Sequence, residues 1–152
     1  MGTDIVGWIE VDVPAQPGYP NDPWAGWTPV IRITDLVERN YGMFGSLFGV
    51  RNDYHFRPIA PDRGQPSDLS AELEEWSEIP VPPWDWAPSW ITWGDLRAMN
   101  WEEPGDVPPE GIHTGIRRRD VLSPGWRTTL DLMERLAQQF GEAGVRMSVW
   151  FF

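Results

Sequence analysis

The chain has 152 residues, of which 41% are hydrophobic and 13% aromatic, with 11 tryptophans. That apolar content is too high for a disordered chain, and the length suits one core, so we expect a single domain over residues 1–152. The net charge is −11. Because a field of that sign repels polyanions, we expect neither duplex nucleic acid nor a membrane as a partner.

The residue types that are missing exclude several chemistries. All twelve basic residues are arginine, and the chain has no cysteine. Lysine-based Schiff bases, P-loop lysines, thiol nucleophiles and thiolate metal sites are therefore ruled out. His55 and His113 are the only imidazoles, and they do not have the spacing of a metal motif. We expect no metal and no cofactor, and a binding protein rather than an enzyme.

The chain begins with a strand, a loop and a second strand. Residues 3–13 predict a strand with apolar side chains on both faces: Ile5, Ile9 and Val11 on one, Val6 and Trp8 on the other. Apolar residues on both faces are typical of a central strand. Residues 14–27 are rich in proline and glycine and predict a long surface loop, and residues 28–33 predict a shorter strand.

A helix is expected next. Asp35 with Glu38 three residues later resembles a capping box, and the helix would include RNYGMFGSLFGVRN, residues 39–52. Apolar residues recur there at roughly helical spacing: Leu36, Tyr41, Phe44, Leu47 and Phe48. Each of its three glycines costs about 1 kcal/mol relative to alanine in an exposed helix. We therefore expect another backbone to pack closely against the glycine face.

The middle of the chain predicts short helices between loops. One short helix is expected at residues 71–76, and a second begins at Thr92, where Asp95 completes a capping signal, and continues through Met99. The segments between these helices and after them are expected to be loops: 79–90, which is extended and rich in proline and tryptophan, and 101–122.

The last third gives the clearest signals. Residues 123–144 predict a helix, with Ser123 as the cap and Pro124 at its first position. One apolar stripe follows its length: Trp126, Leu130, Met133, Ala137 and Phe140. Residues 145–152 predict a strand that pairs with the first one. The fold class is α+β: a small, mainly antiparallel sheet with the N- and C-terminal strands central, backed by two main helices, with long Pro/Trp-rich loops.

A candidate ligand site follows from the four arginines between residues 39 and 63. Guanidinium forks bind phosphate or carboxylate, asparagine hydrogen-bonds bases or sugar hydroxyls, and aromatic rings stack on planar groups. The candidate ligand-binding residues are Arg39, Asn40, Tyr41, Arg51, Asn52, Arg57, Arg63, Asp68 and Trp90.

A purely structural role for these arginines is the alternative. Arginines near helix ends also cap carbonyls or pair with acidic residues, of which there are 23. A straight helix of twelve residues spans about 18 Å, so Arg39 and Arg51 would act separately rather than hold one small phosphate. The basic run RRRD at 117–120 is expected to form salt bridges within the acidic protein rather than to contact phosphate.

Four segments resemble a family of uncharacterised phage and actinobacterial proteins: MGTDIVGWIEV (1–11), RNYGMFGSLFGVRN (39–52), RGQPSDLS (63–70) and SWITWGDL (89–96). The resemblance implies a small phage accessory protein in the cytoplasm of a bacterial host, and it carries over no activity. Such proteins often act by binding.

Three hypotheses result. The first is non-catalytic binding of a small anionic, nucleotide-like ligand, such as a cyclic nucleotide used in host defence signalling, which the protein would sequester. The second is an acidic protein-interaction module that inhibits a host protein. The third and least favoured is a nucleotide or phosphodiester hydrolase using His55 with Asp53 or Asp68. Tryptophan-rich surfaces would also favour a homo-oligomer.

Overall fold

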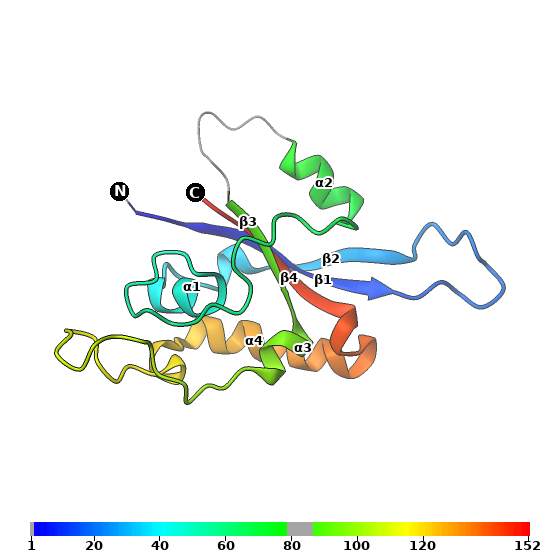
Figure 1. The fold of residues 1–152 in the computed structure, drawn as a ribbon. Helices are drawn as coiled ribbons and strands as arrows, with labels where there is room; N and C mark the ends of the chain where they lie inside the picture. Colours follow the sequence, from blue (N-terminus) through cyan, green and yellow to red (C-terminus); the bar gives the residue numbers. More distant parts are fainter. Residues whose placement is uncertain (1, 79–86) are drawn as a thin grey trace.

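The computed structural model describes residues 2–78 and 87–152 of the chain. Its centre is a four-stranded antiparallel sheet in the order β2-β1-β4-β3 (Figure 1). The strands are β1 (Ile5–Val13), β2 (Gly26–Arg32), β3 (Ala87–Thr92) and β4 (Val145–Phe151). The predicted α+β class and the central position of the first and last strands are confirmed.

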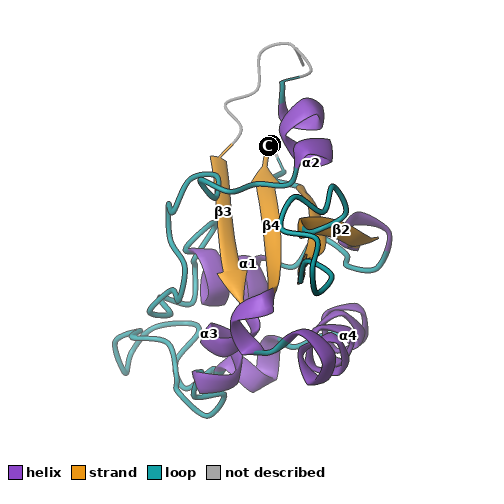
Figure 2. Cartoon of the chain, turned by 90° about the vertical axis from the view of Figure 1, so that its right-hand side faces the viewer, coloured by secondary structure: helices purple, strands orange, loops and turns teal. Residues whose placement is uncertain are grey.

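Within the described residues, four α-helices and three short 3-10 helices surround the sheet. The α-helices are α1 (Tyr41–Phe48), α2 (Ala71–Ser77), α3 (Trp93–Ala98) and α4 (Pro124–Phe140). The 3-10 helices are η1 (Ile33–Asp35), η2 (Arg118–Val121) and η3 (Glu142–Gly144). Figures 1 and 2 place α2 away from the other helices, near one end of the sheet.

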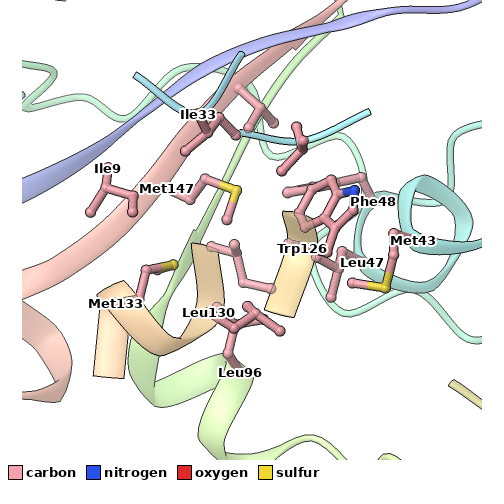
Figure 3. Packing of buried hydrophobic residues seen from close by; sticks show 14 of the residues in the cluster. Ile9, Ile33, Met43, Leu47, Phe48, Leu96, Trp126, Leu130, Met133 and Met147 are labelled. Atoms are coloured by element: carbon pink, nitrogen blue, oxygen red, sulfur yellow. The ribbon is translucent and has the colours of Figure 1, made fainter. Parts of the chain in front are cut away.

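The main core fills the space between the sheet and helices α1 and α4. Trp126 of α4 is fully buried there, with Phe44 of α1 6.3 Å away between ring centroids. Figure 3 shows how side chains from both helices meet those of β1 and β4. Its labelled members are Ile9, Ile33, Met43, Leu47, Phe48, Leu96, Trp126, Leu130, Met133 and Met147. The expected stripe of α4 is therefore the face that packs on the sheet.

A second, smaller cluster lies on the opposite face of the sheet. Val6 and Trp150 pack there against Leu73 of α2, with Trp8 and Trp76 at their side. The three indoles meet edge to face, with centroids 4.8 Å apart for Trp8–Trp76 and 5.0 Å for Trp76–Trp150. Helix α2 therefore explains why β1 is apolar on both faces.

Helix α1 begins later than the sequence predicts. Asn40 is its N-cap, and the Asn40 Oδ1 atom accepts a hydrogen bond from the Met43 N–H at 3.0 Å. Asp35 instead lies in η1, so the proposed capping box with Glu38 is wrong. Gly49, at φ 74°, ends the helix in a left-handed conformation. The extended backbone of Asn40 separates the two short helices, which the apolar spacing alone did not reveal.

The close packing expected at the glycine face is present. A Cβ added to Gly45 would lie 2.8 Å from the Asn52 Cα, and one added to Gly42 would lie 2.5 Å from the Val121 Cβ. The Gly45 contact includes the Asn52 backbone, as predicted, together with the Asn52 Oδ1 atom at 2.7 Å, whereas Gly42 faces a side chain.

The extended loop predicted for residues 79–90 is wrong over its last four residues. Residues 87–90 belong to β3, which pairs with β4 and continues to Thr92, and the rest of that prediction lies outside the described residues. Pro88 is tolerated because β3 is an edge strand. Ser89 and Ile91 are buried on one face of β3. This alternation is too short to predict a strand from the sequence without knowing that the segment pairs with β4.

The other boundaries differ by smaller amounts. Strand β2 starts at Gly26 rather than at residue 28, and α4 ends at Phe140, with Gly141 as its C-cap. Ser123 holds the N-cap position of α4, but its side chain makes no capping bond. The capping box of Thr92 and Asp95 is confirmed. None of the described helices has the length and apolar character needed to cross a lipid bilayer.

Candidate functional site

Three of the predicted ligand-binding residues meet beside the start of β1. The Arg39 guanidinium donates two hydrogen bonds to the Asp4 carboxylate, at 2.8 and 2.6 Å. The Tyr41 Oη atom accepts a hydrogen bond from the Thr3 N–H at 3.0 Å. The Arg51 Nε atom donates to the Thr3 Oγ1 atom at 2.9 Å, and its guanidinium lies 6.0 Å from the Tyr41 ring centroid. The hydrogen bond from Arg39 lowers the pKa of Asp4.

The side chains of the two asparagines and the backbone carbonyl of Arg57 make contacts that hold loops in place. The Asn40 amide donates to the Val121 carbonyl at 2.8 Å, in addition to capping α1. The Asn52 side chain donates to the Phe56 carbonyl at 2.7 Å and accepts from its N–H at 3.0 Å. The exposed Arg57 presents its carbonyl to Arg118, which contacts it at 2.5 Å.

Arg118 belongs to the RRRD run and is a structural residue. Its side chain is 1% exposed and donates to the Ser46 carbonyl at 2.7 Å, so it anchors η2 on α1. The flanking Arg117 and Arg119 both pair with Glu102, at 2.8 and 3.0 Å. The expected salt bridges of this run are confirmed.

Arg63 and Trp90 form a second pair of predicted residues. The guanidinium of Arg63 lies 5.0 Å from the Trp90 ring centroid and binds the Asp95 carboxylate at 2.8 Å. The same guanidinium donates to the Ile59 and Trp90 carbonyls at 3.2 and 3.3 Å. Arg63 thereby links the loop that contains Ile59 to the edge strand β3.

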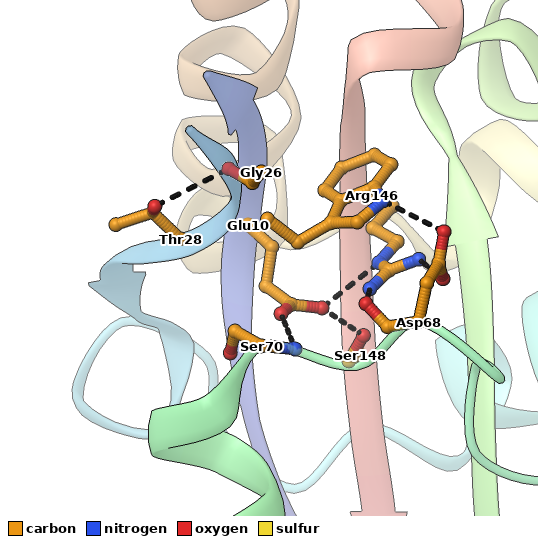
Figure 4. Close-up of polar contacts among 8 residues, drawn as sticks. Glu10, Gly26, Thr28, Asp68, Ser70, Arg146 and Ser148 are labelled. Carbon is orange, nitrogen blue, oxygen red and sulfur yellow. Dashed lines mark hydrogen bonds and ion pairs between the residues drawn. The ribbon is translucent and has the colours of Figure 1, made fainter. Parts of the chain in front are cut away.

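Asp68 belongs to a polar network on the α2 side of the sheet (Figure 4). Its Oδ1 atom binds Arg146 at 2.6 Å, and its Oδ2 atom accepts from the Trp27 indole at 2.9 Å. Arg146 also binds the fully buried Glu10 at 2.9 Å. The guanidinium of Arg146 lies 3.8 Å from the Trp27 ring centroid. Arg146 lowers the pKa of Asp68 by hydrogen bonding to it.

The predicted residues therefore occupy several separate places, each with partners inside the chain. The structure brings Arg39, Tyr41 and Arg51 together and, elsewhere, Arg63 and Trp90. It does not assemble the predicted residues into one ligand site.

A pocket of about 290 Å³ lies between α3 and α4. Its floor is apolar, with Leu96 and Leu130 buried and Leu122 beside them. Trp93 and Trp101 supply indole rings, and the charged lining residues are Arg97, Arg127 and Asp131. Within the described part of the chain, Arg127 has no ion-pair partner. Its guanidinium is therefore available to an anion.

A second hollow of about 360 Å³ shares Trp93 and Arg97 with this pocket. Its other lining residues are mostly polar: Glu134, Ala137, Gln138, Gly141 and Glu142. Arg97 forms an ion pair with Glu142. Trp93 and Arg97 thus separate the pocket between α3 and α4, which contains Arg127, from this second hollow, which contains Glu134 and Glu142.

Sequence reasoning missed this pocket. Trp93 and Arg127 are not among the predicted ligand-binding residues. The two residues lie far apart in the chain and become neighbours because α3 packs on α4. The exposed position of Arg127 on the predicted helix was the only local signal available.

A scan against protein-family models and searches of curated proteins and of solved structures found no match to this chain. Across residues 2–78 and 87–152, no group of three or more His, Asp or Glu side chains is arranged to hold a metal ion.

Proposed function

We propose that the protein binds a small anion with a planar ring, such as a nucleotide, in the pocket between α3 and α4, and releases it unchanged. The supporting observation is the convergence of two indoles and two guanidiniums over an apolar floor. An indole face stacks on a planar ring, and a guanidinium fork binds phosphate. Apolar lining with a few placed polar groups is the usual composition of a ligand site.

Binding without chemistry agrees with the residue types in the pocket. Among the described residues that line the pocket, Asp131 is the only side chain able to act as a general base, and none of them offers a hydroxyl, thiol or imidazole. Together with the resemblance to phage proteins, this supports a role in sequestering a host signalling nucleotide.

Thermal shift combined with mass spectrometry tests the proposal. The protein is incubated with cyclic mononucleotides, cyclic dinucleotides, NAD and ATP, and the ligand is recovered afterwards. At a hundredfold excess over Kd, binding stabilises the fold by about 2.7 kcal/mol. That corresponds to a rise in Tm of roughly 5–11 °C for a domain of this size. An altered product would identify an enzyme, and no shift with any compound would contradict the proposal.

Matched arginine variants locate the site. R127Q removes the guanidinium that α4 contributes to the pocket. R135Q removes another guanidinium of α4, which lies outside the pocket. A lost charge-assisted hydrogen bond costs about 1.5–3 kcal/mol, so R127Q should weaken binding about 10- to 100-fold and R135Q should leave it unchanged. If R39Q abolishes binding and R127Q does not, the ligand binds beside β1 instead.

A further inference from the structure

The connection between β1 and β2 forms an arm that projects beyond the sheet (Figure 1). Two aromatic side chains on this arm face solvent: Tyr19 is 66% exposed and Trp24 is 80% exposed. Trp and Tyr are the residues most often found as anchors at protein interfaces. Their exposure on one projecting arm indicates a contact surface rather than part of the core.

The arm is braced from within by Asp22. Its Oδ2 atom accepts the Gln16 N–H at 3.1 Å, and its Oδ1 atom accepts the Trp24 N–H at 2.9 Å. Backbone bonds from the Tyr19 N–H to the Gln16 carbonyl and from the Asp22 N–H to the Tyr19 carbonyl complete the turn, at 3.0 and 3.1 Å. The aromatic residues are thus held on an ordered loop, which reduces the entropy lost on binding.

A hollow of about 520 Å³ opens at this tip. It is lined by both aromatic residues and by Asp22, together with Asn21, Pro20 and Pro23. Between residues 11 and 31 the chain has two carboxylates, Asp12 and Asp22, and no basic residue. Aromatic faces and a carboxylate both attract a cation, and they repel an anion.

The same pair of groups already holds a cation elsewhere in this molecule. Arg146 lies 3.8 Å from the Trp27 ring centroid and 2.6 Å from an Asp68 oxygen. The arm tip repeats the combination of indole and carboxylate. Within the described residues, however, no guanidinium stacks on Trp24.

We propose that the hollow formed by Tyr19, Asp22 and Trp24 binds a cationic side chain, an arginine or lysine exposed on a partner protein. The charge of −11 on this chain favours a basic partner over a second copy of itself. The site lies on the β1–β2 connection, whereas the anion pocket lies between α3 and α4. The inference is therefore independent of the proposed function.

A titration of the full chain labelled with 5-fluorotryptophan tests this inference. The ¹⁹F signal of Trp24 is assigned by its disappearance in W24F. The probes are acetyl-Gly-Arg-Gly-amide and its citrulline counterpart, which keeps the shape of arginine without the charge. The arginine peptide should shift the Trp24 signal saturably, with an affinity about two- to fivefold above that of citrulline.

Three variants within the hollow and one control outside it separate the contributions of the rings and of the carboxylate. Y19F keeps the ring and should retain binding, whereas W24L removes the π face and should lose it, as followed by shifts of the peptide's own protons. D22N removes the charge but keeps an acceptor for a backbone N–H, and it should weaken binding, whereas D12N, which lies outside the hollow, should not.

Two results would overturn the proposal. One is equal affinity for the arginine and citrulline peptides, or no saturable shift with either at millimolar concentration. The other is a shift of the Trp24 signal that follows protein concentration in the absence of peptide, because the occupant would then be a second copy of this chain.

Discussion

Glu10 and Arg146 face each other across β1 and β4 and are both buried, at 0% and 3% exposure. The Glu10 carboxylate also accepts the Ser148 hydroxyl at 2.7 Å and the Ser70 N–H at 3.1 Å. Each charge is therefore paired and hydrogen-bonded, which a buried charge requires. Removing one partner is far more costly than replacing both, because the remaining charge stays buried.

The first prediction concerns this pair. R146M leaves the Glu10 charge without a counter-ion and should lower the free energy of unfolding by about 3–5 kcal/mol. The double variant E10Q/R146M keeps an acceptor for the Ser70 N–H and carries no buried charge, so it should be more stable than R146M alone. Urea denaturation measures both values. If the double variant is the less stable of the two, the unpaired buried charge of Glu10 is not the cause of the lost stability.

The second prediction concerns pH. Arg146 lowers the pKa of Asp68 in the folded protein, so the folded carboxyl binds a proton less readily than the unfolded one, whose pKa is about 3.9. This contribution to stability is present above the unfolded pKa and is lost as the pH falls through the folded pKa. Chemical denaturation between about pH 5 and pH 2 should therefore show that the free energy of unfolding falls less steeply with decreasing pH in D68N than in the wild type. Equal slopes would contradict the assignment.

At the residue scale, the sequence could identify candidate side chains but not their partners. Asp68 and Arg63 were predicted as ligand-binding residues because of their types and their neighbours. Their actual partners, Arg146 and Asp95, lie 78 and 32 residues further along the chain. An arginine paired across the fold and one open to a ligand have the same local sequence signal.

At the element scale, α1 shows how a poor helix former is stabilised by packing. It is eight residues long, contains two glycines, and is buried over nearly its whole length. Gly42 and Gly45 let Val121 and Asn52 approach closely, which offsets the low helix propensity of glycine.

The third prediction follows from that contact. G45A gains about 1 kcal/mol of helix propensity, but its Cβ meets the Asn52 backbone at 2.8 Å. Overpacking costs about 1–3 kcal/mol, so a net loss of stability is expected. G94A in α3 is the matched control, since its Cβ would have its nearest contact at 3.6 Å, and it should be neutral or stabilising. Thermal denaturation distinguishes the two, and a stabilised G45A would show that the contact is loose.

The fourth prediction concerns β4. All seven of its residues are buried, and it pairs with both β1 and β3. Deleting Val149 to Phe152 would expose the centre of the sheet and should abolish soluble expression. Removing the exposed Phe152 alone should leave the fold intact. Expression tests and circular dichroism check both, and a folded four-residue truncation would contradict the central position of β4.

The elements that the sequence predicted best are those with strong local patterns. β1 is predicted from its apolar residues on both faces, α4 from one apolar stripe, and β4 from an aromatic-rich segment expected to pair with β1. By contrast, β3 is short, contains Pro88, and owes its existence to hydrogen bonds with β4. The first helix is predicted to start too early because Asp35 and Glu38 resemble a capping box, whereas Asp35 lies inside η1 and α1 begins only after Asn40.

At the scale of the whole molecule, uncompensated negative charge is the main electrostatic feature. The net charge is −11, and the exposed carboxylates of α2 make no ion pairs within the described chain: Glu72, Glu74 and Glu75. Such self-repulsion destabilises the compact state.

The fifth prediction is a dependence on salt. Raising NaCl from about 10 to about 150 mM shortens the Debye length from about 30 to about 8 Å. Screening should therefore raise Tm, by about 2–4 °C for each 1 kcal/mol gained. The variant E74Q/E75Q, measured in parallel, should begin with a higher Tm at low salt and respond less. A fall in Tm with salt would mean that attractive ion pairs dominate.

The position of β4 between β1 and β3 also sets the order of assembly. Ile5 of β1 pairs with Phe151 of β4. The β1–β4 hydrogen bonds therefore join residues that are separated by nearly the whole length of the chain. During synthesis, β1 has its β2 neighbour early but stays open on the other side until residues 145–151 have been made. Non-local pairing of this kind slows folding and leaves apolar strand edges open meanwhile. Until residues 145–151 pair with both neighbours, the inner edges of β1 and β3 therefore stay open to pairing with other chains, which favours aggregation.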